Sequence, residues 1–321
     1  MDGVTPVDDR STNGRVRACR RTVMRVDTMV SRATAAGQVR PPAPPEDVAA
    51  ALDALTDLVA AGGVLVLSGA GISTESGIPD YRGPSSAART ASPMTWQTFT
   101  GDPVARHRYW ARSHLGWRTI GTARPNDGHR AVAALERHGL LTGVVTQNVD
   151  GLHQAAGAGA VTDLHGRLDR VRCLDCGGLS ARSELEARLT EVNQGWHAVA
   201  TGINPDGDVD LPDSALDGFT LLGCTGCGGV LKPDVVFFGE TVPPERVAHC
   251  YQLLEDSRSL LVLGSSLTVM SGHRFVIRAA RDGRPVAIVN QGAPRGDRYA
   301  AVTVDAPLGQ VLPALVARTT G

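Results

Sequence analysis

Four short, largely apolar runs limit the folds open to this 321-residue chain. The runs cover residues 64–67, 140–146, 260–263 and 286–289. An apolar run of this length, without alternation of polar residues, is typical of a strand that is buried on both faces. Apolar residues at helical spacing occupy the segments 47–60, 127–138, 243–256 and 271–282. Strands that alternate with helices predict a doubly wound parallel sheet of the α/β class.

Composition and charge exclude several other classes of protein. Hydrophobic residues make up 42% of the chain, which is enough for a sizeable core, whereas six cysteines are too few for a disulfide-rich secreted scaffold. No apolar run approaches the ~20 residues of a membrane-spanning helix. The net charge of -1 argues against a chain that coats nucleic acid. We therefore expect neither a membrane nor a nucleic acid as partner.

Residues 1–45 differ from the rest of the chain. Arginine outnumbers aspartate there, apolar residues show no sustained period, and the segment ends in a proline-rich run. This composition predicts a disordered leader or linker. A secretory apolar region is missing, and Asp8 and Asp9 argue against an organelle transit peptide. We expect an extension without function, with Met24 and Met29 as alternative starts.

Two Cys-x-x-Cys pairs form the most specific local pattern in the sequence. They consist of Cys173 with Cys176 and of Cys224 with Cys227. Chance placement of six cysteines rarely gives two such pairs, and glycines follow each pair, as tight metal-binding turns require. Four thiolates predict one structural Zn²⁺ with no open coordination position, and a redox-active cysteine pair is the alternative. Residues 167–232 interrupt the alternation of strands and helices, and we interpret them as an inserted module. Cys19 and Cys250 receive no role.

Polar or glycine-rich segments follow all four apolar runs. They lie at 68–73, 146–153, 264–267 and 290–292. Each segment alone is also compatible with an ordinary strand-end turn. Thr74 stands where the third glycine of the dinucleotide fingerprint would fall, but the glycines at 69 and 71 would let backbone N–H groups approach a phosphate and start a helix. Because parallel strands end at one edge of a sheet, the four segments together predict a dinucleotide-binding crevice.

Two further segments carry candidate functional groups. The loop at 77–83 contains Asp80 and Arg82, which either are solvated charges or lie over a ligand beside the glycine turn. His165 precedes Gly166 at the start of the inserted module. A neutral imidazole is the usual general base near pH 7, although most histidines are surface or structural residues.

Taken together, these motifs resemble the sirtuins, and the resemblance covers residues 47–318. It rests on the order and spacing of the segments 69–82, 146–153, 232–240 and 264–266, of His165, of the two cysteine pairs and of Asn290. The segments 80–82, 109–112 and 205–209 and the long interval between the cysteine pairs are similar to the class II branch.

The resemblance implies a Rossmann-like doubly wound parallel sheet with an inserted smaller zinc-binding module. It divides the chain into a leader (1–45), the first part of an NAD-binding domain (46–166), a zinc-binding small domain (167–232) and the second part of the NAD-binding domain (233–321). The resemblance also implies an NAD-dependent protein-lysine deacylase, which transfers the acyl group to ADP-ribose and releases nicotinamide. Zn²⁺ would be a structural ion in this enzyme, and we expect a monomer in the cytoplasm.

The same resemblance assigns roles to individual residues. His165 would be the general base on a ribose hydroxyl, with Asn148 as a second catalytic residue. NAD would be bound by Gly69, Ala70, Gly71, Ile72, Asp80, Tyr81, Arg82, Gln147, Asn148, Asp150, Gly264, Ser265, Ser266, Asn290, Gln291, Gly292 and Leu308. An acylated-lysine protein or peptide would pair with the backbone of Val236, Phe237, Phe238 and Gly239.

The preferred acyl group depends on Tyr109 and Arg112. On a helix these two residues share a face, and similar pairs in another sirtuin branch bind acidic acyl groups. We hypothesise that Arg112 favours acyl groups with a terminal carboxylate, and an ion pair with a nearby acid is the alternative.

Two other classes of function remain open from the sequence. A mono-ADP-ribosyltransferase would cleave the same cofactor, and a non-catalytic NAD or zinc module would bind a partner. The presence of His165, Asn148 and Asp150 favours catalysis, because a pure sensor does not need a base.

Overall fold

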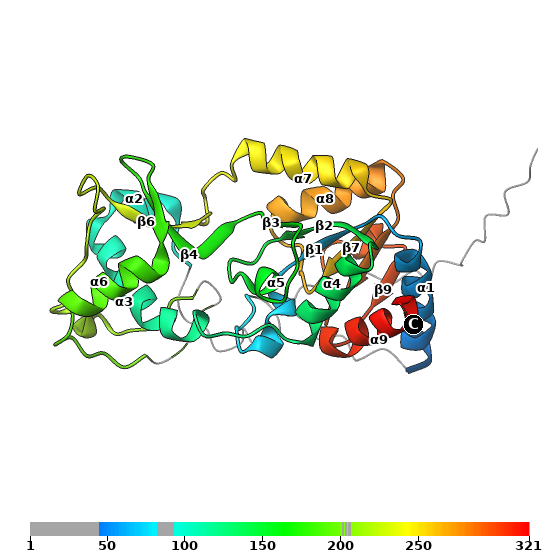
Figure 1. The fold of residues 1–321 in the computed structure, drawn as a ribbon, viewed down its shortest axis with the longest axis horizontal. Coiled ribbons are helices and arrows are strands. Elements are labelled where there is room, and N and C mark those ends of the chain that lie inside the picture. The colour runs from blue at the N-terminus through cyan, green and yellow to red at the C-terminus, as the bar shows by residue number, and fades with distance from the viewer. Residues whose placement is uncertain (1–44, 82–92, 201, 203, 205–206, 321) are drawn as a thin grey trace, which may run out of the picture. The chain divides into compact units, whose positions relative to one another are not determined.

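The computed structural model describes residues 45–81, 93–200, 202, 204 and 207–320 (Figure 1). Its helices are α1 (Pro45–Ala60), α2 (Trp96–Gly101), α3 (Pro103–Ile120), α4 (Asp127–Arg137), α5 (Leu152–Ala155), α6 (Arg182–Val192), α7 (Pro244–Asp256), α8 (Met270–Arg281) and α9 (Leu308–Thr320). Its strands are β1 (Val64–Ser68), β2 (Leu141–Thr146), β3 (Val161–Asp163), β4 (Gly166–Cys173), β5 (Leu179–Ala181), β6 (Leu231–Val235), β7 (Ser259–Leu263), β8 (Val286–Val289) and β9 (Val302–Val304). The prediction for residues 1–44 lies outside the described residues, and α1 begins at Pro45, two residues before the predicted start.

The main sheet has six strands in the order β3-β2-β1-β7-β8-β9, and every neighbouring pair is parallel. Numbered within this sheet alone, the order is 3-2-1-4-5-6, which is that of a doubly wound dinucleotide-binding fold. The four predicted strands are present as β1, β2, β7 and β8. The chain reverses its direction of travel across the sheet between β1 and β7, and ligands bind at such a point in open α/β sheets. The predicted fold class is confirmed.

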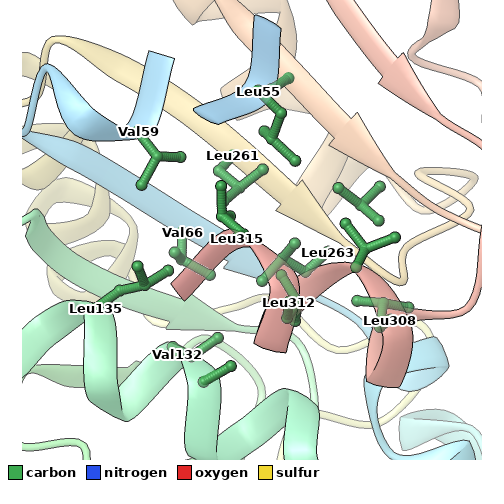
Figure 2. Packing of buried hydrophobic residues seen from close by; sticks show 14 of the residues in the cluster. Leu55, Val59, Val66, Val132, Leu135, Leu261, Leu263, Leu308, Leu312 and Leu315 are labelled. Atoms are coloured by element: carbon green, nitrogen blue, oxygen red, sulfur yellow. The ribbon is translucent and has the colours of Figure 1, made fainter. Parts of the chain in front are cut away.

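Helices cover both faces of the main sheet, because successive residues of a strand point to opposite faces and the central strands are apolar throughout. Val66 of β1 packs with α1, α4 and α9 on one face, in the cluster of buried side chains shown in Figure 2. Leu65 and Leu67 pack with α7 and α8 on the other face. All five residues of β1 are buried, as the uninterrupted apolar run predicted. At ~25 cal/mol per Å² of apolar surface, this two-sided burial is the main stabilisation of the sheet.

A smaller antiparallel sheet has the order β5-β4-β6 and carries the cysteine pairs. Its apolar residues form a separate cluster with α2, α3 and α6. The buried rings of Phe99, Tyr109, Trp110 and Phe237 meet in this cluster, with the centroids of Tyr109 and Phe237 5.3 Å apart. Helices α2 and α3 therefore contribute to the core of the small sheet, although they precede it in the sequence by more than forty residues.

Among the described residues, none of the helices has the length and apolar character needed to cross a membrane.

Candidate functional site

The turns after β1 and β7 touch each other through their backbones at the carboxyl edge of the main sheet. The N–H of Gly69 donates to the carbonyl of Leu263 at 2.9 Å, and the N–H of Gly71 donates to that of Gly264 at 2.8 Å. A Cβ atom on Gly71 would lie 2.8 Å from the Cα of Gly264, so a side chain does not fit there. Gly264 also has a φ of 59°, which favours glycine. Glycine is therefore required at positions 71 and 264 because the two turns approach each other so closely.

The glycine turn does not start an α-helix, contrary to the prediction. Two three-residue 3₁₀ turns follow it, Ala70–Ile72 and Thr74–Ser76. The physical reason is that Gly71 directs its N–H to the β7 turn and that Gly77, with a φ of 83°, ends the second 3₁₀ turn in the left-handed region. The backbone donors of Gly69 and Gly71 are thus already used within the fold.

Gln147 connects the turns that follow β1, β2 and β7. Its N–H donates to the carbonyl of Ser68 at 2.9 Å, and its Oε1 accepts a hydrogen bond from Ser265 Oγ at 2.7 Å. Gly272, in the first turn of α8, lies so close that a Cβ there would be 2.5 Å from the Gln147 Nε2. The Gln147 side chain is therefore fixed between β7 and α8.

A polar network lies beside Gln147. Asn148 Nδ2 donates to Gly69 O at 3.1 Å and to Ser73 Oγ at 3.0 Å. Ser73 Oγ in turn donates to Asp150 Oδ2 at 2.7 Å, and Asp150 Oδ1 accepts the N–H of Leu152. Burial raises the pKa of Asp150 because it disfavours the charged carboxylate. The structure thus brings Asn148 and Asp150 together with the glycine turn, as the sequence predicted for residues that follow neighbouring strands.

Two buried histidines support this network from α4 and α5. The ring centroids of His129 and His153 are 5.0 Å apart, and His153 Nε2 lies 2.9 Å from Ser68 Oγ. His129 Nε2 lies 3.4 Å from Ser73 Oγ. Burial lowers the pKa of His129 to about 3 and that of His153 to about 4, so both imidazoles are neutral near pH 7.

His165 lies between Gln147 and the first turn of α8. Its Nδ1 is 2.9 Å from the carbonyl oxygen of Gln147, and its Nε2 is 2.8 Å from Ser271 Oγ. Burial lowers the pKa of His165, and the positive charges of Arg246 and Arg274 lower it further, whereas the hydrogen bond to Gln147 raises it. A neutral imidazole at the carboxyl edge of the sheet has the chemistry of a general base.

The predicted substrate segment, Val236 to Gly239, is fixed at both ends. The N–H of Val236 donates to the carbonyl of His165 at 2.8 Å, and the carbonyl of Phe238 accepts the N–H of Trp96 at 2.9 Å. Buried Lys232 lies 3.2 Å from Glu240 Oε2, which also accepts the N–H of Phe237. The only lysine of the chain therefore closes the loop that carries this segment.

The predicted cofactor loop is described only in part. The ring of Tyr81 contacts that of Phe238, with centroids 6.0 Å apart, so the loop borders the substrate segment. Asp80 is half-buried beside it. Arg82 lies outside the described residues.

Arg112 forms ion pairs with two carboxylates. Its Nη2 lies 3.1 Å from Asp208 Oδ2 and 3.3 Å from Asp210 Oδ1, and its Nε donates to the carbonyl of Val209. Tyr109, one turn earlier in α3, is buried among aromatic rings. These contacts favour the ion-pair alternative for Arg112 over a role as receptor for an acyl carboxylate, because its charge is already compensated.

The remaining residues predicted to bind NAD, apart from Leu308, follow β7 and β8. Asn290 Nδ2 donates to the carbonyls of Gln291 and Gly292, both at 2.9 Å, and so closes its own turn. Ser266 Oγ accepts a hydrogen bond from Thr268 at 3.1 Å. Leu308, the first residue of α9, is buried in the main apolar cluster, where Figure 2 shows it. The structure thus brings all of these residues except Leu308 to the ends of neighbouring strands.

The four paired cysteines converge at one point. Their Sγ atoms lie within 4.8 Å of one another, with 3.6 Å between Cys173 and Cys227 and 3.9 Å between Cys176 and Cys224. Zn–S bonds of ~2.3 Å in a tetrahedron place sulfur atoms roughly 3.8 Å apart, so the arrangement fits zinc. The cluster would hold one structural Zn²⁺.

Sequence reasoning missed several residues of the site. Ser73 and Ser271 contact the predicted residues Asp150 and His165. His129 and His153 contact Ser73 and Ser68 in turn, and these residues come from segments that are far apart in the chain. The signal that was available is their position, because Ser73 ends the glycine turn and His153 ends the polar segment after β2. No local signal marks His129 or Ser271, because each lies within a helix.

Comparison with known proteins agrees with this geometry. The Sir2 family profile matches residues 69–271. The chain is 66% identical over 258 residues to "NAD-dependent protein deacetylase 1" of Streptomyces coelicolor. The aligned region covers 80% of this chain and 86% of the relative. It is 52% identical over 253 residues to a protein of the same name from Corynebacterium efficiens, and this alignment covers 77% of this chain and 90% of the relative.

Solved structures agree with the sequence relatives. A Sir2 protein solved with a peptide and NAD⁺ has a TM-score of 0.66 at 28% identity and covers 83% of this chain and 97% of its own. Another Sir2 enzyme has a TM-score of 0.67 at 30% identity, and the match covers 84% of this chain and 98% of that enzyme's chain. The sheet order, the four-cysteine cluster and these matches together show that this chain belongs to the Sir2, or sirtuin, family.

Proposed function

We propose that this chain is an NAD-dependent protein-lysine deacylase, which transfers an acyl group from lysine to ADP-ribose and releases nicotinamide. The observation that carries the proposal is the position of His165, a neutral imidazole held by Gln147 O at the edge where β1 and β7 end. The 66% identity to a protein named as an NAD-dependent deacetylase supports the same activity. A binding module would not need a base at this edge.

The donor groups at the carboxyl edge fit NAD. Amide groups of Gln147 and Asn148 suit a carboxamide, and the carboxyl of Asp150 suits hydroxyl or amide donors. We infer that NAD is held by Gly69, Ala70, Gly71, Ile72, Asp80, Tyr81, Arg82, Gln147, Asn148, Asp150, Gly264, Ser265, Ser266, Asn290, Gln291, Gly292 and Leu308. When bound, NAD⁺ supplies the electrophilic ribose carbon that takes the acyl oxygen.

His165 acts as general base in this proposal. Its Nδ1 faces a carbonyl oxygen, which accepts hydrogen bonds only, so the proton of the neutral ring lies on Nδ1. Nε2 then carries the lone pair and can take a proton from a ribose hydroxyl. Asn148 is the second proposed catalytic residue, and its hydrogen bonds to Gly69 and Ser73 fix its side-chain amide beside the glycine turn.

An acylated-lysine protein or peptide is the proposed partner. The segment from Val236 to Gly239 lies next to His165 and is held by Lys232 and Glu240. The contacts of this segment to His165 and α2 use only some of its backbone N–H and C=O groups. An extended peptide would pair with the remaining ones, as in β-augmentation. We propose that Arg112 holds the segment 207–210 against α3, so that this segment shapes the site for the acyl group.

The remaining assignments extend this proposal. We propose class II membership, a monomer and a cytoplasmic location. The domain ranges of 46–166 and 233–321 for the NAD-binding part and 167–232 for the zinc module are retained, with α2 and α3 supporting the core of the module.

One incubation tests the proposed function against its rivals. The protein is mixed with NAD⁺ and an acetyl-lysine peptide, and nicotinamide, O-acetyl-ADP-ribose and deacetylated peptide are followed by mass spectrometry. The proposal predicts all three products. ADP-ribose on protein without deacetylated peptide would instead identify a transferase, and NAD⁺ binding without nicotinamide release would identify a binding module.

A further inference from the structure

Ser271 is the second residue of α8, and its hydroxyl faces the proposed base. The Oγ atom lies 2.8 Å from His165 Nε2, and the residue is 8% exposed. Serine in the first turn of a helix commonly bonds to the local backbone. Here the N-cap of α8 is Val269, whose side chain caps nothing, and the hydroxyl of Ser271 is directed to the imidazole.

The two contacts of His165 together define its tautomer. The Gln147 carbonyl can only accept, so Nδ1 donates to it and Nε2 is unprotonated in the neutral ring. Ser271 Oγ must therefore be the donor in its hydrogen bond with Nε2. The bond has this direction only while the ring is neutral. A protonated ring would require the hydroxyl to turn and accept instead, beside the positive charges of Arg246 and Arg274, so the bond as it stands favours the neutral Nδ1–H form, which has the lone pair where a base needs it.

The charges around the ring act in the same direction. Arg246 of α7 and Arg274 of α8 are the charged groups that affect His165, and both disfavour a protonated imidazole. The N-terminus of α8 adds a partial positive charge on the same side. Only the Gln147 carbonyl opposes these effects, because it favours a protonated ring.

We propose that Ser271 is a positioning residue for His165: its hydroxyl holds Nε2 as an acceptor until a ribose hydroxyl takes its place. This inference rests on the proposed function, in which His165 is the general base. The exchange replaces one O–H donor by another, so the imidazole keeps its tautomer and orientation when the ligand arrives. Ser271 itself takes no proton.

The first test observes His165 without any reaction. Protein with ¹⁵N-labelled histidine is titrated by NMR, and His165→Gln identifies the signals of this ring. Wild type should show a neutral ring protonated on Nδ1. In Ser271→Ala the pKa of His165 should rise by about half to one pH unit, because a neutral hydrogen bond that stabilised the unprotonated ring is lost. The proton should stay on Nδ1 in this variant, because the Gln147 carbonyl still holds it, and an unchanged pKa would overturn the inference.

The second test measures deacylation against pH. In Ser271→Ala the acidic limb of kcat/KM, which reports the free enzyme, should move to higher pH, with about three- to tenfold lower kcat/KM on that limb and a near-normal value on the alkaline plateau. Ser271→Thr keeps the hydroxyl and should restore the wild-type profile. Ser257→Ala removes another buried serine hydroxyl, which bonds to Leu254 O, and should leave the profile unchanged.

The outcomes separate this inference from the proposed function. A uniform loss of rate at every pH in Ser271→Ala, with Tm lowered equally in Ser271→Thr, would show a purely structural role and overturn the inference. A fully active His165→Ala would overturn the assignment of the base, whatever the titration of Ser271→Ala shows.

Discussion

At the scale of residues, the site is a set of neutral polar groups that are buried and mutually hydrogen-bonded. Ser68 and His153 are 0% and 1% exposed, and Asn148 is 9% exposed. Each would be costly to bury alone, by about 1–3 kcal/mol for an unpaired group, so their hydrogen bonds are required for the fold as well as for the site. The histidines are part of this network only while they are neutral.

Acid should therefore destabilise the protein through His129 and His153. Their folded pKa values of about 3 and about 4 lie below the ordinary 6.5, so the unfolded chain binds protons first as the pH falls. Stability is full above pH 6.5 and decreases from there towards pH 4. Between pH 6.5 and about pH 5 each histidine should remove roughly 2 kcal/mol from the free energy of unfolding.

Urea denaturation at pH 7 and pH 5 measures this effect. His153→Gln should show a decrease that is smaller by about 2 kcal/mol than that of wild type, because one of the two groups no longer titrates. His138 is exposed, and His138→Gln should behave as wild type. An equal decrease in His153→Gln and wild type would contradict the account of these two residues.

Arg112 gives a second prediction at this scale. Arg112→Leu removes the cation that Asp208 and Asp210 contact, so we expect a lower Tm and a rate that falls by a common factor for acetyl-, succinyl- and methylglutaryl-lysine peptides. The ratio of the three rates should stay within about twofold, a discrimination of less than ~0.5 kcal/mol. Arg118 is exposed on the same helix, and Arg118→Leu serves as control. A loss confined to the two acidic acyl groups would instead make Arg112 their receptor.

At the scale of elements, two turns and one sheet position the site. The β1 and β7 turns meet at Gly71 and Gly264, which fixes the carboxyl edge of the main sheet. The small sheet joins that edge through His165, which immediately precedes β4 and accepts the N–H of Val236. A change in the small sheet should therefore alter the base and the substrate segment together.

Removal of the metal tests this connection. Wild type should hold about one zinc ion per chain, and a four-thiolate site contributes directly to folding. Cys224→Ser should lose the zinc, lower the Tm and reduce deacylation, and a strong chelator should have the same effect on wild type. Metal analysis with thermal unfolding measures both quantities.

A matched control uses the cysteine outside the cluster. Cys250 is buried in α7, and burial raises the pKa of its thiol to about 12. Cys250→Ala should keep about one zinc per chain, even where the smaller side chain lowers the Tm. Full zinc content in Cys224→Ser would contradict the proposed ligand set.

At the scale of the whole molecule, much of the fold followed from periodicity. The four apolar runs became β1, β2, β7 and β8, because a strand buried on both faces has no polar alternation. β3 and β9 were missed, since each has three residues with polar threonine in the middle. The strand order could not be predicted from periodicity, because pairing of β1 with both β2 and β7 joins segments far apart in the chain.

The residues of the candidate site also divide into those that the sequence predicted and those that it did not. Residues at strand ends, such as Asn148 and Ser265, were predicted because topology places such residues at one edge. His129 and Ser271 were not, because a helix position says nothing about which distant group it meets. The glycine turn starts two short 3₁₀ helices in place of an α-helix, since the turn is held by contact with the turn after β7 that no local pattern encodes.

The central claim is that one base at the carboxyl edge couples cleavage of NAD⁺ to removal of an acyl group from lysine. The most direct measurement is the ratio of nicotinamide, deacylated peptide and O-acyl-ADP-ribose formed by wild type and by His165→Ala. Wild type should form the three in equal amounts, and His165→Ala should form deacylated peptide at least ~100-fold more slowly while its Tm and zinc content stay unchanged. Deacylated peptide formed at the wild-type rate by His165→Ala, or formed without nicotinamide, would contradict the account.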